Sequence, residues 1–361
     1  MKLEIVQYIE KFGLSLLEQT FAIKVSRHKK YNNLVHLKYN QLESDFSRIE
    51  VKQARGIILD EDNNWSVVAY PYNKFWEFDN PLADIIDWKT AKVFEKVDGL
   101  LCYLFWYDNQ WHVATSGTPD GGGNVGDFNF TFAELFWKTW NDLNYKLPAH
   151  TTLTYIFELC TPYNRVVVPH KTSRIVFHGA RKIKNEYYQE SYCYDIASLN
   201  PSWEAIKSFD LKSWDECIKV SQDLNPMEQE GFVVCDAFFN RIKLKTEQYK
   251  RIAKIRDHIS INSIIEIIRK GEDLEFLKYY PEFTDLYNDI YNRYLNLILN
   301  VRKIYQGIIA ALQENYTRKD FAQKAVNTPY KDILFQLFDH KDIRNILINM
   351  NIKYLKQLLK L

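Results

Sequence analysis

The stretch Lys96-Val97-Asp98-Gly99 stands between one apolar run that ends at Phe94 and another that begins at Leu100. Asp-Gly is a common turn dipeptide, so these four residues by themselves also fit an ordinary surface turn. Whether Lys96 is a turn residue or a reactive amine therefore depends on the charged residues elsewhere in the chain.

Three later stretches place charged side chains in or beside apolar strands: Phe157-Glu158-Leu159, Glu230-Gly231-Phe232-Val233-Val234 and Ile242-Lys243-Leu244-Lys245. Glu158 alone also fits an edge strand whose carboxylate points to water. Lys243 and Lys245 are two residues apart, which puts both ammonium groups on one face of a strand. Two such cations near acidic strands favour a phosphate site over a core position.

Short β-branched or aromatic runs bounded by polar turns predict strands over residues 54–59, 65–69, 100–107, 111–115, 152–160, 174–179, 231–235 and 241–245. Helices are predicted over 1–20 and 130–143. After residue 246 apolar residues recur at helical spacing, as at Ile261, Ile264, Ile265 and Ile268. We therefore predict two domains, 1–246 and 247–361, the second all-α with four to six helices.

Composition indicates a globular protein, with 46% hydrophobic and 26% charged residues. No signal peptide or membrane-length apolar run is present, and the five cysteines show no C-x-x-C spacing. We expect an intracellular, cytoplasmic protein without a zinc site. Residues 241–361 carry 22 Lys and Arg against 14 Asp and Glu, whereas residues 1–240 carry 25 against 32. The basic C-terminal part fits either a phosphate-backbone surface or helices with solvated lysines.

The order Lys-x-Asp-Gly, Glu, Glu-Gly, Lys-x-Lys resembles the motif series of the covalent nucleotidyltransferases, which comprise DNA ligases, RNA ligases and mRNA capping enzymes. Three further stretches narrow the resemblance: Ala54-Arg55-Gly56-Ile57-Ile58, Lys74-Phe75-Trp76 and Thr161-Pro162-Tyr163-Asn164-Arg165-Val166-Val167. Over residues 30–250 the chain is similar to the RNA ligase 1 family, the phage-type ligases that repair tRNA.

That resemblance implies an α+β fold: an ATP-grasp-like nucleotidyltransferase domain on antiparallel sheets with flanking helices, followed by an all-α domain that chooses the RNA. It implies an ATP-dependent ligase, acting in the cytoplasm of a cell or of a phage- or virus-infected host. The substrates would be 5′-phosphate and 3′-hydroxyl RNA ends, broken tRNA among them, and the protein would be a monomer.

The resemblance also implies the site residues. Lys96 would be the catalytic nucleophile that forms lysyl-AMP. Glu230 and Glu158 would hold Mg²⁺ or Mn²⁺. The nucleotide would be bound by Tyr39, Arg55, Lys74, Asp98, Gly99, Glu158, Lys243 and Lys245. Because an ordinary lysine is protonated at neutral pH, we expect the metal, Lys243 and Lys245 to favour the neutral form of Lys96.

Two features depart from the family. Leu100 stands where the family often has Ser, and residues 114–118 lack the basic side chains of its hairpin. None of the eight histidines forms a metal-binding or catalytic pattern, and His178 is expected to be a satisfied core histidine.

Other readings remain open from the sequence. A DNA ligase or capping guanylyltransferase would share the motifs, but such enzymes usually carry a β-rich OB domain after the Lys-x-Lys strand. A non-catalytic RNA-binding protein on a decayed ligase fold would have lost chemical residues that this chain keeps.

Overall fold

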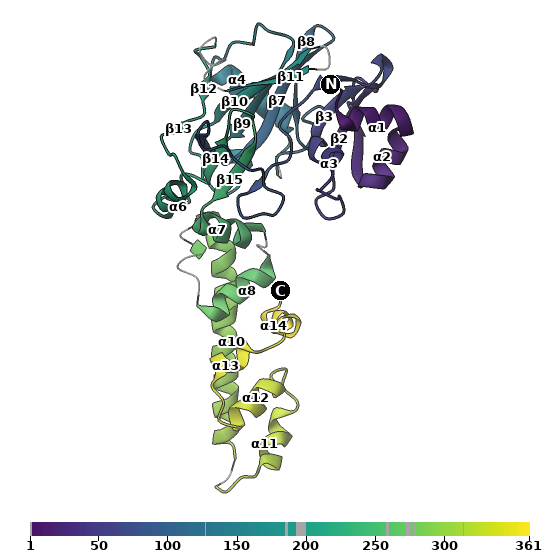
Figure 1. Ribbon diagram of the computed structural model, residues 1–361. Coiled ribbons are helices and arrows are strands. Elements are labelled where there is room, and N and C mark those ends of the chain that lie inside the picture. Colours follow the sequence, from purple (N-terminus) through teal and green to yellow (C-terminus); the bar gives the residue numbers. More distant parts are fainter. Residues whose placement is uncertain are drawn as a thin grey trace. The chain divides into compact units, whose positions relative to one another are not determined.

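The computed structural model describes residues 2–126, 128–184, 187–192, 200–257, 260–271, 276–277, 279–312 and 314–361. The chain forms two compact units, Met1–Arg251 and Ile252–Leu361. The first unit contains three sheets, and the second is helical in its described residues (Figure 1).

Helices α1 (Glu4–Phe12) and α2 (Leu14–Phe21) open the chain. One helix was predicted here, but Gly13 has φ +85° and separates the two. They pack with α3 (Ile49–Gln53) on an antiparallel sheet of order β1-β2-β3-β4. Its strands are Ile23–Arg27, Leu34–Tyr39, Arg55–Asp60 and Ser66–Ala69, and a 3-10 turn spans Glu61–Asn63.

The second sheet has the order β11-β10-β9-β7-β8, and β12 pairs in parallel with β10. Its strands are β7 (Leu100–Tyr107), β8 (Gln110–Thr115), β9 (Leu153–Cys160), β10 (Arg174–Lys184), β11 (Tyr187–Tyr192) and β12 (Glu204–Ala205). Helix α4 (Phe132–Asp142), which begins at a capping box of Thr131 and Glu134, packs aromatic side chains onto this sheet. A 3-10 turn, Pro162–Asn164, follows β9.

The third sheet has the order β13-β6-β14-β15-β5 and is antiparallel except for the β15–β5 pair. Its strands are β5 (Trp76–Glu77), β6 (Lys92–Lys96), β13 (Ser208–Phe209), β14 (Gly231–Cys235) and β15 (Arg241–Lys245). Helix α6 (Trp214–Gln222) packs against β14 and β15 and buries Cys217 there.

Helix α7 (Glu247–Asp257) begins in the first unit, and the second unit is built on the long helix α10 (Thr284–Ala310). Helices α8, α11, α12 and α14 contact α10 along its length (Figure 1). The remaining bounds are α8 (Ile261–Lys270), η3 (Pro281–Phe283), α11 (Arg318–Ala325), α12 (Lys331–Phe338), α13 (Ile343–Ile348) and α14 (Ile352–Leu359). The described α-helices within residues 247–361 outnumber the four to six that were predicted for this range. Helices of six to eight residues contain too few turns to show a clear period in the sequence.

The α+β class with antiparallel sheets and a helical C-terminal region is confirmed. The two-residue strands β5, β12 and β13 were not predicted, because two residues show no alternation. Among the described residues, no helix is long and apolar enough to cross a membrane.

Candidate active site

Lys96 is the last residue of β6, and the strand register brings it beside the start of β14. Lys96 pairs with Gly231, and Gly231 pairs with Lys245 at the end of β15. Because Glu230 directly precedes β14, three neighbouring strands bring Lys96, Glu230 and Lys245 together.

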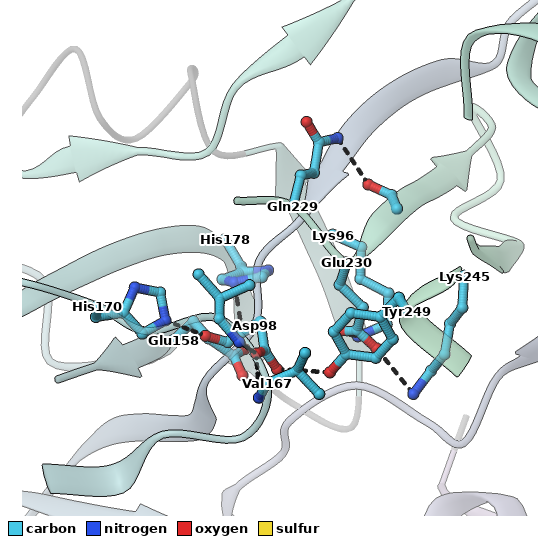
Figure 2. Close-up of polar contacts among 12 residues, drawn as sticks. Lys96, Asp98, Glu158, Val167, His170, His178, Gln229, Glu230, Lys245 and Tyr249 are labelled. Atoms are coloured by element: carbon cyan, nitrogen blue, oxygen red, sulfur yellow. Dashed lines mark hydrogen bonds and ion pairs between the residues drawn. The ribbon is translucent and has the colours of Figure 1, made fainter. Parts of the chain in front are cut away.

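The Glu230 carboxylate is buried between these two lysines (Figure 2). Its Oε2 accepts a hydrogen bond from Lys96 Nζ at 2.5 Å, and its Oε1 lies 2.8 Å from Lys245 Nζ. Burial lowers the pKa of Lys96, but the carboxylates of Glu230 and Glu158 outweigh it and raise that pKa above its ordinary value. Without nucleotide and metal, Lys96 therefore favours its charged form, and the shift toward the neutral form that we expect from a bound metal ion stays a prediction.

The lysine whose pKa is lowered is Lys243. Ile242 and Leu244 point into the core of the third sheet, and Lys243 and Lys245 lie on the opposite face, as their spacing predicted. Burial, followed by the charges of Lys96, Lys74 and the other nearby cations, lowers the pKa of Lys243 to about 7. This face of β15 therefore concentrates positive charge, and a bound anion would reduce the repulsion among these cations.

Glu158 on β9 faces His178 on β10. Their Oε2 and Nε2 atoms are 3.4 Å apart, and the His178 Nε2 is buried without a hydrogen-bond partner among the described residues. Burial raises the pKa of Glu158 to about 8 and lowers that of His178 to about 3. The prediction of a satisfied core histidine is wrong. The β9–β10 register shifts between Phe177 and Gly179, so His178 is a bulge residue whose side chain turns out of the core.

A second bulge positions Arg55. The β2–β3 register skips Gly56, whose φ is +97° and whose added Cβ would lie 3.1 Å from Ser116 Cα. Glycine is therefore required at this position. The Arg55 guanidinium lies 5.1 Å from the Phe75 ring centre, and its Nη1 donates to the Asn73 carbonyl at 3.3 Å.

A cavity between the second and third sheets, here the first cavity, joins these side chains. Its charged and aromatic lining consists of Arg55, Tyr72, Phe75, Phe94, Lys96, Glu158, His178 and Arg241. Its volume of about 110 Å³ is below the ~300–1,000 Å³ typical of ligand sites. A nucleotide therefore enters only if lining side chains such as Lys96 move. Sequence reasoning overlooked Arg241, although it shares the alternating face of Lys243 and Lys245.

Asp98 and Gly99 shape the site from behind. The buried Asp98 carboxylate accepts backbone N–H bonds from Val167 and Val168 at 2.7 and 2.6 Å, and a hydroxyl bond from Tyr249 at 2.7 Å. The Asp98 side chain thus holds the loop after β9 and the first turn of α7 (Figure 2). A Cβ on Gly99 would lie 2.6 Å from the Leu159 carbonyl oxygen, so glycine lets β7 approach β9.

Tyr39 and Lys74 are near each other, but neither lines the first cavity. The Lys74 ammonium lies 5.1 Å from the Tyr39 ring centre and 4.8 Å from that of Trp76, and it donates to Gln41 Oε1 at 3.3 Å. Lys74 lines an adjacent cavity that shares Tyr72, Phe75 and Arg241 with the first. Tyr39 therefore contacts the site through Lys74.

The carboxylates fit a metal ion that keeps its water shell. In the described part of the chain, no three His, Cys, Asp or Glu side chains gather as a dry metal site. Glu158 and Glu230 are near enough for each charge to affect the other, and among the described residues the one ion pair of the Glu158 carboxylate is the long contact with His178. A hydrated Mg²⁺ needs only one or two such carboxylates. The described cysteines are free and buried, and Cys193 lies outside the described residues.

Fold and site together have the features of a lysine-dependent nucleotidyltransferase. A family model described as RNA ligase matches residues 53–249, more than half of the chain, and the chain belongs to this family. The resemblance found in the sequence is confirmed.

Individual relatives agree with the family match. The chain is 24% identical over 316 residues to a protein of Autographa californica nuclear polyhedrosis virus named as a bifunctional polynucleotide kinase/RNA ligase, covering 81% of this chain and 44% of that protein. It is 28% identical over 219 residues to an RNA ligase of Rhodothermus phage RM378, covering 50% and 47%. An archaeal ATP-dependent RNA ligase structure aligns at 14% identity and a TM-score of 0.46, over 85% of this chain and 83% of that one. The chain spans less than half the length of the two curated relatives.

Proposed function

We propose that this chain is an ATP-dependent RNA ligase that joins 5′-phosphate and 3′-hydroxyl RNA ends through lysyl-AMP and an adenylylated RNA. The observation that carries the proposal is the Lys96–Glu230–Lys245 cluster, whose Lys96 lines the first cavity together with Arg55, in a chain of the RNA ligase family. An amine among cations is suited to attack a phosphate, because the cations stabilise the negative charge that develops there.

In the first step the Lys96 nitrogen attacks the α-phosphorus of ATP. An N–P bond forms, the bond to the β-phosphate breaks, and pyrophosphate leaves. Lys96 must first lose a proton, which Glu230 and Glu158 oppose by raising its pKa. A hydrated Mg²⁺ or Mn²⁺ held by Glu158 and Glu230 would supply positive charge that cancels this effect.

The other cations would position the phosphates. Lys243 and Lys245 share the strand face beside Lys96, where the α-phosphate must lie for attack. Arg55 and Lys74 would orient the β- and γ-phosphates so that pyrophosphate leaves in line with the attacking nitrogen. Asp98 and Gly99 would bind the nucleotide indirectly, by fixing the loop behind Lys96, and Tyr39 would act through Lys74.

In the later steps lysyl-AMP passes AMP to an RNA 5′-phosphate, and an RNA 3′-hydroxyl then attacks and releases AMP. We assign the choice of RNA, broken tRNA included, to residues 252–361, which carry 17 Lys and Arg against 13 Asp and Glu. We also propose that the protein acts as a monomer in RNA repair in the cytoplasm of a host cell. The viral and phage sources of the relatives support the host location.

The test is incubation with ATP labelled at the α-phosphate and Mg²⁺, followed by denaturing electrophoresis and by sealing of 5′-phosphorylated RNA. We expect a labelled protein band and joined RNA. Glu230→Ala and Lys243→Ala should fold but not seal. Wild-type protein that takes no label would support the decayed-ligase reading, and a variant that seals at the wild-type rate would refute the role of its residue.

The same assay separates the related enzymes. Labelling by GTP rather than ATP would indicate a capping guanylyltransferase, and sealing of nicked DNA rather than RNA would indicate a DNA ligase. The helical residues of the second unit favour RNA ligase over both, because those enzymes usually carry an OB domain.

A further inference from the structure

The cavity adjacent to the first one, here the second cavity, has a volume of about 310 Å³. Its charged lining consists of Lys52, Lys74, Arg181 and Arg241 against the single carboxylate Asp84. Asp84 already accepts the Arg241 backbone N–H at 3.2 Å through Oδ2. This local excess of positive charge stands out because residues 1–240 together carry more acidic than basic side chains.

Lys52 is the cation in the second cavity that the fold leaves available. Among the described residues its ammonium makes no ion pair or hydrogen bond, whereas Arg181 donates to the Pro71 carbonyl at 2.7 Å and lies over the Tyr70 ring. Lys52 belongs to helix α3. The backbone carbonyl of Lys52 accepts a hydrogen bond from the backbone N–H of Lys74, so the two lysines lie on the same wall of the cavity. A lysine that has no carboxylate partner and lies near other cations is suited to bind a phosphate.

An exposed aromatic ring stands at the same cavity. Phe238 is 76% exposed in the turn between β14 and β15, yet that turn is firmly held. The fully buried Asp236 accepts the backbone N–H groups of Phe238 and Asn240, and the next residue, Phe239, has φ +61°. A bulky residue with positive φ is rare and costs energy, and such strain concentrates at functional sites.

We propose that, once pyrophosphate has left, the second cavity and Phe238 form a subsite for single-stranded RNA next to the end that is joined. Lys52 binds a backbone phosphate and Phe238 stacks on a base. Phosphate contacts and aromatic stacking are the two ways in which proteins hold single strands without reading their sequence. The subsite adjoins the first cavity through Tyr72, Phe75 and Arg241, so a bound strand lies beside Lys96. This inference rests on the proposed function.

The test compares RNA binding with self-adenylylation in the full chain. Binding of a fluorescently labelled single-stranded RNA with a 3′-hydroxyl is followed by anisotropy at several salt concentrations. Lys52→Ala should weaken binding and lower the slope of log Kd against log salt by about 0.7, the value for one phosphate contact on a single strand. Phe238→Ala should weaken binding roughly tenfold. Both variants should keep the wild-type KM for ATP in self-adenylylation.

Matched variants outside both cavities are Lys146→Ala, compared with Lys52→Ala, and Phe12→Ala, compared with Phe238→Ala. Lys52→Arg should retain RNA affinity. Unchanged RNA binding in Lys52→Ala and Phe238→Ala would overturn the inference. If the KM for ATP were raised in these variants as well, the cavity would be assigned to the ATP phosphates instead. If the wild-type chain does not bind RNA, the inference is overturned even if self-adenylylation occurs. If the chain binds RNA but does not adenylylate itself, the result counts against the proposed function alone.

Discussion

The Tyr249 hydroxyl lies 2.7 Å from Oδ1 of Asp98, although 151 positions separate the two residues. Asp98 follows Lys96 by two residues, and Tyr249 belongs to the first turn of α7. The start of this helix is therefore part of the compact unit that carries Lys96, whereas the sequence analysis had placed it with the C-terminal residues.

Removing this hydroxyl should destabilise the first unit. Tyr249→Phe leaves the buried Asp98 with two of its three donors, and a lost bond to a buried charged group costs about 1–3 kcal/mol. Urea unfolding followed by tryptophan fluorescence measures the change. Tyr163→Phe, at an exposed ring, should change the free energy of unfolding far less. Equal effects of the two substitutions would refute the anchoring role.

A truncation should succeed only if it spares Tyr249. Residues 1–251 should keep self-adenylylation with ATP and lose discrimination between broken tRNA and plain single strands. Residues 1–246 should be less stable, because they lack the donor to Asp98. Self-adenylylation and thermal unfolding of both fragments provide the measurement. Full discrimination by the longer fragment would show that residues 252–361 do not choose the RNA.

Lys96→Ala should abolish the covalent protein–AMP adduct, because Lys96 lines the first cavity, whereas Lys245, on the other side of Glu230, does not. Lys96→Arg should be equally inactive, since a guanidinium does not lose its proton near neutral pH. Mass spectrometry of the protein after incubation with ATP and Mg²⁺ detects the adduct. An acid-labile adduct in either variant would assign the nucleophile to another residue.

Glu158→Gln should stabilise the protein without nucleotide and metal, and the gain should grow with pH. Burial raises the pKa of Glu158 from its ordinary 4.5 to about 8. The folded protein therefore binds this proton more tightly than the unfolded chain, and the stability it contributes is lost as pH rises from about 4.5 through about 8. Differential scanning fluorimetry across this range should show a widening difference in Tm. A difference that is constant with pH would contradict the raised pKa.

Gly231→Ala should destabilise the first unit by more than about 4 kcal/mol, as severe core clashes do. Its φ is +149°, and an added Cβ would lie 1.9 Å from the Leu244 carbonyl oxygen on β15. Gly307→Ala is the comparison, because nothing lies within 4 Å of its added Cβ and alanine favours the surrounding helix. Chemical denaturation distinguishes them, and a mild effect at Gly231 would refute the close β14–β15 approach.

The sequence alone determined those features that show as a regular spacing of side chains along the chain. Strands such as Leu100–Tyr107 and Arg241–Lys245, the shared face of Lys243 and Lys245, and the helical texture of the C-terminal residues were all predicted. Alternation of side chains and helical spacing arise from the backbone itself, so they are visible without knowledge of the fold.

Tertiary structure alone decided which of these residues meet and what their neighbours do to their charges. The register that sets Lys96 beside Gly231, the bulge that turns His178 toward Glu158, and the burial that raises the pKa of Glu158 all depend on distant strands. Pairing register and desolvation are properties of packed elements, and no local pattern encodes them. The same limit explains why Tyr249 and the second cavity had no counterpart in the sequence analysis.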